Sequence, residues 1–189
     1  AAYASAGSQP VAPRIASHRR RPSGAAGVDE PLAVVGFACK FPAGAESSAR
    51  FERGLALGTD GVVEVPFTRW ELDEYHDANP DALGKMYPRH AGFVDDVELF
   101  GAAFFGVSGP EAKSMDPQQR LILDVCYDGL FGAGQDKSAL LGSDIGVLVG
   151  QSNNDWIQVN SLDIRKISPY TATGISAAIS AARVSYALG

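Results

Sequence analysis

Two short apolar runs in the chain have the pattern of strands that are buried on both faces. Residues 32–36 (LAVVG) and 144–150 (DIGVLVG) are nearly continuous in their apolar character, rich in valine, and flanked by proline, glycine or polar residues. Strands of a parallel sheet that is covered by helices on both sides show this pattern, whereas half-exposed strands alternate apolar and polar positions. The two runs therefore predict a buried parallel sheet.

Two further stretches have the composition and the end signals of helices. The stretch 47–58 begins with serines that can cap a helix, places Phe51 and Leu55 on one face, and ends at Gly58. The last stretch, 176–189, is an alanine-rich helical pattern whose small residues permit close packing. Together with the two buried strands, these helices indicate the α/β class.

The clearest local signal lies at 116–134. Asp116 can cap a helix there, Pro117 stands at the first helical position, and Gln119 can reach back to the cap, as in a capping box. Apolar residues then recur at helical spacing: Leu121, Ile122, Val125, Cys126 and Leu130. We predict one long helix with an apolar face, ended by the glycines at 132 and 134.

The region 59–110 has no long helical period. Residues 61–66 (GVVEVP) are typical of an extended segment, 73–92 of a long polar loop, and 98–108 (ELFGAAFFGVS) of a compact apolar cluster. Insertions of this length are often functional.

Charge is unevenly distributed along the 189 residues. Residues 1–28 hold four arginines and no acid, so that 12 of the 16 basic and all 22 acidic residues lie from Asp29 onward. Residues 1–29 are rich in Ala, Ser, Pro and Gly and predict a disordered linker. An Arg-rich organelle transit peptide is an alternative, as is a nucleic-acid contact through HRRR, but the acidic remainder argues against nucleic acid.

The composition favours one globular domain of ordinary size in a reducing compartment. The chain is 46% hydrophobic and 20% charged, and its two cysteines, Cys39 and Cys126, are too few for a disulfide framework. No run reaches the roughly 18 apolar residues of a membrane helix, and no signal peptide is visible at the N-terminus. We expect a soluble protein.

Standard catalytic and metal-binding patterns are absent from the sequence. There is no G-x-x-x-x-G-K-[ST] loop, no complete G-x-G-x-x-G fingerprint and no G-x-S-x-G elbow. The DANPD stretch at 77–81 lacks the glycine and glutamate that a calcium loop needs. His18, His76 and His90 stand apart from one another and from both cysteines, so that no metal site is expected.

Several motifs, in their order and spacing, resemble one family. The stretches PLAVVGFACKFP, GKMYPRHAGFVDDVELFGAAFFGVSGPEAKSMDPQQRLILDV, GVLVGQSNNDW and YTATGISAAISAARVSYALG are similar to the N-terminal part of the β-ketoacyl synthase domain of modular type I polyketide synthases. The resemblance covers 30–189. It implies a thiolase-like fold, an αβαβα sandwich built from two halves, of which this chain matches mostly the first. It also implies a homodimer.

The resemblance implies an activity whose catalytic residues this chain does not contain. The family's nucleophile is a cysteine in a D-T-A-C-S-S motif, expected roughly a dozen residues beyond Gly189, and its two histidines and lysine follow later. The parent protein would hold an acyl group on that cysteine and condense it, with decarboxylation, with a malonyl-type unit. Substrates would be carried on the phosphopantetheine arm of an acyl carrier protein. We expect no directly bound cofactor or metal, and no activity from this chain alone.

The resemblance also implies the context of the enzyme. Its partners would be the acyl carrier protein and acyltransferase domains of a synthase, with no nucleic acid and no membrane span. We expect a cytoplasmic enzyme, or a plastid enzyme if the leader is a transit peptide. Alternatives are a non-catalytic dimerisation or interaction fragment, a short interaction module, and a condensing enzyme of fatty acid synthesis.

Cys39 is the residue of this chain that most invites a catalytic interpretation, and we predict that it is structural. It follows an apolar run and precedes Lys40, but its position matches none of the family's catalytic residues. A free cysteine in such surroundings packs as a small hydrophobe. Cys126 is expected to do the same from the apolar face of its helix.

Other residues have a structural and a functional interpretation. Asp116 and Arg120 either form an ion pair that braces the active-site floor or serve as a helix cap and a partner for another acid, which we favour. By resemblance Trp156, Tyr170 and Thr173 lie near the acyl pocket or the dimer interface, although packing is the simpler expectation. Gly129 departs from the family pattern and costs about 1 kcal/mol relative to alanine inside a helix.

Overall fold

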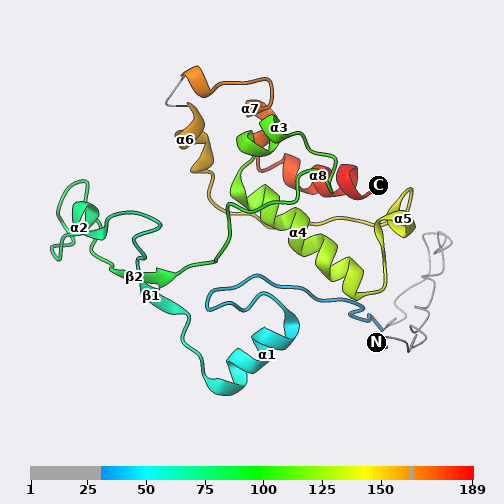
Figure 1. The fold of residues 1–189 in the computed structure, drawn as a ribbon, viewed down its shortest axis with the longest axis horizontal. Coiled ribbons are helices and arrows are strands. Elements are labelled where there is room, and N and C mark those ends of the chain that lie inside the picture. The colour runs from blue at the N-terminus through cyan, green and yellow to red at the C-terminus, as the bar shows by residue number, and fades with distance from the viewer. Residues whose placement is uncertain (1–30, 162–163) are drawn as a thin grey trace, which may run out of the picture.

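The computed structural model describes residues 31–161 and 164–189. The predicted linker at 1–29 lies outside these residues. Figure 1 shows the order of the elements. In chain order they are α1 (Ser48–Leu57), β1 (Val62–Glu64), α2 (Leu72–Tyr75), β2 (His90–Gly92), α3 (Gly109–Ser114), α4 (Pro117–Gly132), α5 (Lys137–Leu140), α6 (Trp156–Ser161), the 3₁₀ helix η1 (Ile164–Lys166), α7 (Thr171–Ile175) and α8 (Ile179–Leu188).

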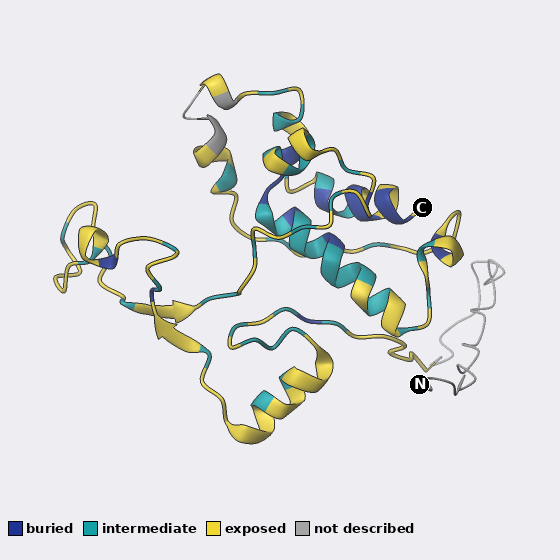
Figure 2. Ribbon diagram, in the orientation of Figure 1, coloured by how far each residue is buried: buried dark blue, intermediate teal, exposed yellow. Residues whose placement is uncertain are grey.

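The core lies where α4 packs against α8. Figure 2 shows the buried residues concentrated on these two helices and on the segment that leads into α4. The buried apolar cluster consists of Phe105, Met115, Leu123, Leu140, Val184, Ala187 and Leu188. The helix that the capping pattern predicts at 117–132 is thus the central element of the fold.

The predicted apolar cluster at 98–108 packs on the same helix. The ring of Phe105 stacks on that of Phe100, with centroids 5.4 Å apart, and meets Phe104 edge-on at 5.0 Å. Tyr127 of α4 contacts Phe104 at 4.7 Å. Aromatic contacts of this geometry add to the free energy gained by burial, so that they fix this segment against α4.

The elements between 48 and 92 lie away from the helical core (Figure 1). Helix α1 begins where predicted, with the Ser47 hydroxyl accepting from the Arg50 amide, and ends at Gly58, which has a positive φ of 64°. Strands β1 and β2 form an antiparallel pair with Val63 opposite Ala91. The predicted extended segment at 61–66 is therefore confirmed over β1. The long loop predicted at 73–92 is only partly correct, because it begins within α2 and its last three residues form β2 by pairing with β1.

The predicted parallel strands are not formed among the described residues. Neither 32–36 nor 144–150 is a strand, and Leu32 and Leu148 are 100% and 94% exposed. A parallel strand needs hydrogen-bonding neighbours and a helix layer on each face. Both segments have α4 on one side, and neither has a neighbouring strand in the described part of the chain.

The alanine-rich stretch forms a shorter helix than predicted. Helix α8 begins at Ile179 rather than at 176, because Ser176 is extended (φ −86°, ψ 116°) and ends α7. This break is part of the site described below.

Within the described residues, no helix is both long and apolar enough to cross a bilayer.

Candidate functional site

The connection between α3 and α4, residues 114–116, is the point where four elements meet. We call it the α3–α4 junction. The Ser114 carbonyl accepts the indole N–H of Trp156 (3.0 Å), and the Ser114 hydroxyl lies 3.1 Å from that of Ser168. The backbone N–H of Asp116 donates to the Gly174 carbonyl (2.8 Å). The junction therefore ties α4 to α6, to α7 and to the chain between them.

The contact between the junction and α7 depends on a glycine. Gly174 is buried, and a Cβ at this position would overlap the Ser114 carbonyl group. Its φ is not positive, so that glycine is needed for the close approach of two backbones rather than for an unusual conformation.

Asp116 caps α4, as the sequence pattern predicts. Its carboxylate accepts the backbone N–H of Gln118 at 2.8 Å, and the residue is only 2% exposed. A buried carboxylate at this position satisfies an N–H group that has no partner within the helix.

Gln119 does not complete the predicted capping box. Its side-chain amide donates instead to the carbonyls of Thr173 and Ser176, both at 3.1 Å. Gln119 is 1% exposed, and its Oε1 has no hydrogen-bond partner among the described residues. The sequence pattern found this residue but not its partners, because α7 comes more than fifty residues later in the chain.

Arg120 and Asp116 form no ion pair in the described part of the chain. Burial lowers the pKa of the half-buried Arg120, while the charges of Asp116, Asp124 and Glu98 act in the opposite direction. An arginine remains cationic under such conditions. The cap at Asp116 is thus formed as favoured, whereas the pairing of Arg120 with another acid stays a prediction.

The three residues proposed for the acyl pocket or dimer interface all lie around the junction. Trp156 and Tyr170 are half-buried and Thr173 is exposed. Besides the Trp156 contact, the Thr173 hydroxyl donates to the Tyr170 carbonyl (3.2 Å), and the Thr173 carbonyl accepts from Gln119. The structure thus brings these residues together, and their contact with an acyl chain stays a prediction.

A largely buried ion pair that the sequence did not reveal joins α8 to α3. Arg183 is 8% exposed, and its guanidinium donates to the Glu111 carboxylate at 2.6 Å. Nearby, the Ser180 hydroxyl donates to Gln151 Oε1 at 2.5 Å. An arginine inside an otherwise uncharged helix is the signal that could have indicated a paired Arg183, although not its partner, since buried cations are almost always paired.

Both cysteines are free thiols in structural positions. Cys39 is buried, and its S–H donates to the Ala45 carbonyl at 3.6 Å. Burial raises the pKa of the half-buried Cys126. A cysteine nucleophile needs the opposite, a pKa lowered by a cation or a helix N-terminus.

The cavity beside Cys39 is acidic. It has a volume of about 540 Å³ and includes Lys40, Asp124 and Asp128 in its lining. Burial, together with the charge of Asp128, raises the pKa of Asp124 to about 6.

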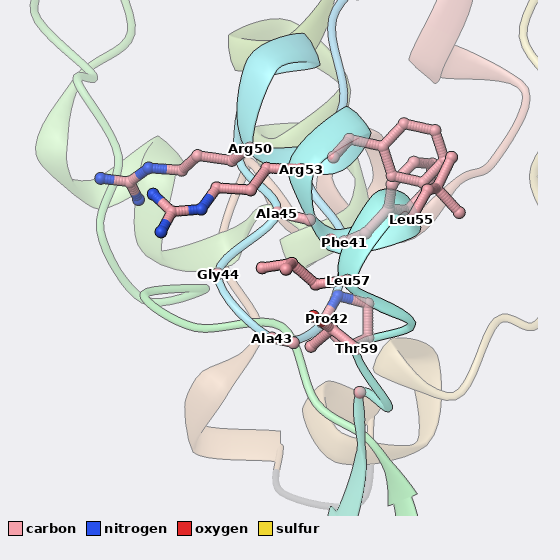
Figure 3. Close-up of a pocket in the computed structure, with 13 residues that line it drawn as sticks. Phe41, Pro42, Ala43, Gly44, Ala45, Arg50, Arg53, Leu55, Leu57 and Thr59 are labelled. Carbon is pink, nitrogen blue, oxygen red and sulfur yellow. The ribbon is translucent and has the colours of Figure 1, made fainter.

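A separate cavity of about 440 Å³ lies between α1 and the 41–45 loop (Figure 3). Its wall is apolar at Pro42 and Leu57, and the side chains of Arg50 and Arg53 extend side by side from α1. None of the residues singled out by the sequence for a catalytic or binding role lines it. The described residues contain no group of three or more His, Cys, Asp or Glu side chains that could hold a metal ion.

Comparison with known proteins identifies relatives along almost the whole described region. Residues 29–189 match the family model described as Beta-ketoacyl synthase, N-terminal domain. The chain is 39% identical over 162 residues to the pikromycin polyketide synthase component PikAII of Streptomyces venezuelae, covering 85% of this chain and 4% of that protein. It is 39% identical over 162 residues to the erythronolide synthase EryA3 of Saccharopolyspora erythraea, covering 85% and 5%.

Solved structures give the same result for the fold. The oxazolomycin ketosynthase domain OzmH KS7 of Streptomyces albus superposes with a TM-score of 0.73 at 36% identity, covering 82% of this chain and 27% of that one. The module 6 ketosynthase of the bacillaene synthase of Bacillus subtilis gives a TM-score of 0.69 at 30% identity, covering 82% and 24%. The fold is thus that of the first part of a thiolase-like ketosynthase domain, as the resemblance predicts.

The chain spans about a quarter of these ketosynthase structures and less than a tenth of the named synthases. The family model, the related synthases and the solved ketosynthase structures agree on one assignment. The chain belongs to the β-ketoacyl synthase family and is the N-terminal part of a ketosynthase domain of the polyketide synthase type.

Proposed function

We propose that this chain is the first part of a condensing enzyme. In the parent protein an acyl group is transferred to a cysteine as a thioester. A malonyl-type unit on an acyl carrier protein then loses CO₂ and attacks that thioester, which yields a β-ketoacyl carrier protein and frees the cysteine thiol. The observation that supports this most strongly is the superposition on a solved ketosynthase domain over 82% of the chain.

The contribution of the present residues is structural. By resemblance, the nucleophilic cysteine and the two histidines and lysine that assist it lie beyond Gly189. Cys39 is occupied with a backbone carbonyl, and the pKa of Cys126 is raised, so neither is suited to hold the acyl group. We therefore propose that the chain alone is inactive and that its helices support the segment carrying the nucleophile.

The partners follow from the family's chemistry. The substrates would arrive on the phosphopantetheine arm of an acyl carrier protein, after loading by an acyltransferase domain. We further propose a homodimer, and a cytoplasmic location in keeping with the bacterial relatives. Those relatives lend no support to a plastid transit peptide.

A non-catalytic dimerisation or interaction fragment is the second candidate. The observation that favours it is the exposure of large apolar side chains near α4 and on α8, among them Val34, Leu148 and Tyr186. Large apolar side chains exposed side by side are typical of regions that contact another protein surface.

The coding sequence beyond Gly189 separates the two candidates. The condensing enzyme requires D-T-A-C-S-S within roughly a dozen residues of Gly189, followed by the two histidines and the lysine. The protein that contains this continuation should convert an acyl thioester and malonyl carrier protein into a β-ketoacyl carrier protein, detected by mass spectrometry. Its cysteine-to-alanine variant is the control. A different residue at the nucleophile position would overturn the proposal in favour of the non-catalytic candidate.

A further inference from the structure

Gln119 joins the start of α4 to the turn between α7 and α8. Its side chain is 1% exposed and places both of its hydrogen bonds on backbone carbonyls, those of Thr173 and Ser176. These two acceptors fix the orientation of the amide, since exchanging its oxygen and nitrogen would set three carbonyl oxygens against one another. Gln119 is therefore the donor in both hydrogen bonds.

The two carbonyls lie where α7 ends. The last four carbonyls of a helix have no partner within that helix, and Thr173 belongs to this group in α7 (Thr171–Ile175). Ser176 is extended and breaks the helix. The Gln119 amide thus caps the C-terminal end of α7 from another helix, as a local glycine or an arginine side chain does elsewhere.

The same contact sets the beginning of α8. The Ser176 carbonyl accepts both from Gln119 and from the backbone N–H of Ile179 (3.1 Å), the first residue of α8. Further along, α8 is attached to α3 by Arg183 and Glu111. The direction of α8 is therefore fixed at its start by Gln119 and along its length by the ion pair.

We propose that Gln119 is a positioning residue for the condensation reaction. This inference depends on the proposed function, in which the nucleophile follows shortly after α8. Gln119 holds the α7–α8 turn on the α3–α4 junction, and so sets the direction in which the chain leaves α8 toward the reactive cysteine. A turn released from Gln119 places that cysteine less accurately, and errors near 1 Å already slow enzymatic reactions strongly.

The first experiment measures hydrogen exchange of this chain as it stands. The variants are Gln119→Leu and Gln119→Met, which keep most of the volume but lack the donors. Gln118→Leu is the matched control, since Gln118 is the neighbouring glutamine and its amide makes only long contacts of 3.4 Å to Asp116 and Asn153. Amides at 176–182 should exchange about tenfold faster in both Gln119 variants, as expected for a lost buried hydrogen bond, with 121–130 unchanged.

The second experiment measures cysteine acylation in the protein that continues past Gly189. The single-turnover rate should fall about tenfold in the Gln119 variants, with the KM for the acyl thioester within about twofold of wild type. Gln118→Leu should acylate at the wild-type rate.

The outcomes distinguish the two proposals. Wild-type acylation rates in both Gln119 variants would overturn the positioning role. So would exchange that increases equally over α4 and α8, because that result marks a general loss of stability. A wild-type protein that is not acylated at all would overturn the proposed function, while the exchange experiment would still decide whether Gln119 holds the turn.

Discussion

Close contacts in this structure are made at glycines that face backbone from distant parts of the chain. Gly174 lies against Ser114, and Gly36 lies against the carbonyl of Gly129 in α4. A glycine inside a helix costs about 1 kcal/mol, and Gly129 departs from the family pattern for no reason visible in the sequence. The structure does not require glycine at this position either, since a Cβ on Gly129 would meet Ala38 at 3.7 Å, an ordinary van der Waals distance. The close crossing of α4 by residues 36–38 requires the glycine at 36, whose Cβ would overlap the Gly129 carbonyl oxygen.

Replacing Gly174 by alanine should destabilise the fold. The added Cβ would overlap the Ser114 carbonyl, which is backbone and cannot rotate away. We expect the free energy of unfolding to fall by about 2–3 kcal/mol, as overpacking of a tight site does. Urea unfolding followed by circular dichroism measures this change.

Gly132→Ala is the matched control for Gly174→Ala. A Cβ on Gly132 meets nothing within 4 Å, and its φ is not positive. This variant should be as stable as wild type or more stable, by up to about 1 kcal/mol. Equal losses at the two positions would contradict the close-contact argument.

Asp124 should make the stability of the chain depend on pH. Burial, with the charge of Asp128, raises the pKa of Asp124 from 3.8 to about 6 in the folded state. Between these values the folded state binds more protons than the unfolded state, so the contribution of Asp124 to stability falls as pH rises from about 4 to about 6.

The Asp124→Asn variant tests this dependence. The variant should lack that part of the decline. In urea unfolding, the midpoint of the variant minus that of wild type should therefore be larger at pH 7 than at pH 4.5. Asp128→Asn removes the like charge and should give a smaller change of the same sign. A stability gain of Asp124→Asn over wild type that is larger at pH 4.5 than at pH 7 would contradict the predicted direction.

At the scale of elements, the sequence predicted those parts of the fold that are specified locally. The caps at Ser47 and Asp116, the stop at Gly58 and the apolar spacing after Pro117 placed α1 and α4 correctly. The two apolar runs were predicted as strands because their composition suits a parallel sheet. A strand is defined by its neighbours, and none pairs with these runs in the described residues.

The candidate site was predicted only in part, for a related reason. Asp116, Gln119, Trp156, Tyr170 and Thr173 were all singled out from motifs, and the structure brings them to one place. Their partners were missed because most of these contacts join residues far apart in the chain. The Arg183–Glu111 pair was missed altogether, since nothing local to either residue indicates the other.

The Arg183–Glu111 pair should be strongly coupled. Removing one partner leaves the other charge poorly compensated in a largely buried position. We expect Arg183→Met to lower the free energy of unfolding by roughly 3 kcal/mol, and the double variant with Glu111→Gln to lose less than the sum of the single losses. Additive losses in this double-mutant cycle would show that the two side chains do not interact.

At the scale of the whole molecule, the described chain has a small core and much exposed apolar surface. The core lies between α4 and α8, whereas the segments at 32–35 and 148 leave apolar side chains in solvent. This arrangement fits a part of a larger domain whose remaining elements would cover those segments.

Exposed apolar surface should make the chain self-associate. Sedimentation velocity at increasing concentration should show species larger than a monomer, because burying such side chains is favourable. A Val34→Ser, Leu148→Ser double variant should associate less. Leu83→Ser is the control, since Leu83 is also exposed but lies in the loop between α2 and β2. Equal effects of the two changes would contradict the assignment of the associating surface to the segments beside α4.

The most direct test of the central claim is to locate the acylated cysteine. Intact-mass and peptide mass spectrometry would follow incubation of an acyl thioester with this chain and with the protein that continues past Gly189. The account predicts that Cys39 and Cys126 stay unmodified in both, and that the longer protein gains one acyl group on a cysteine beyond Gly189. An acyl group on Cys39 or Cys126 of the folded protein would contradict it.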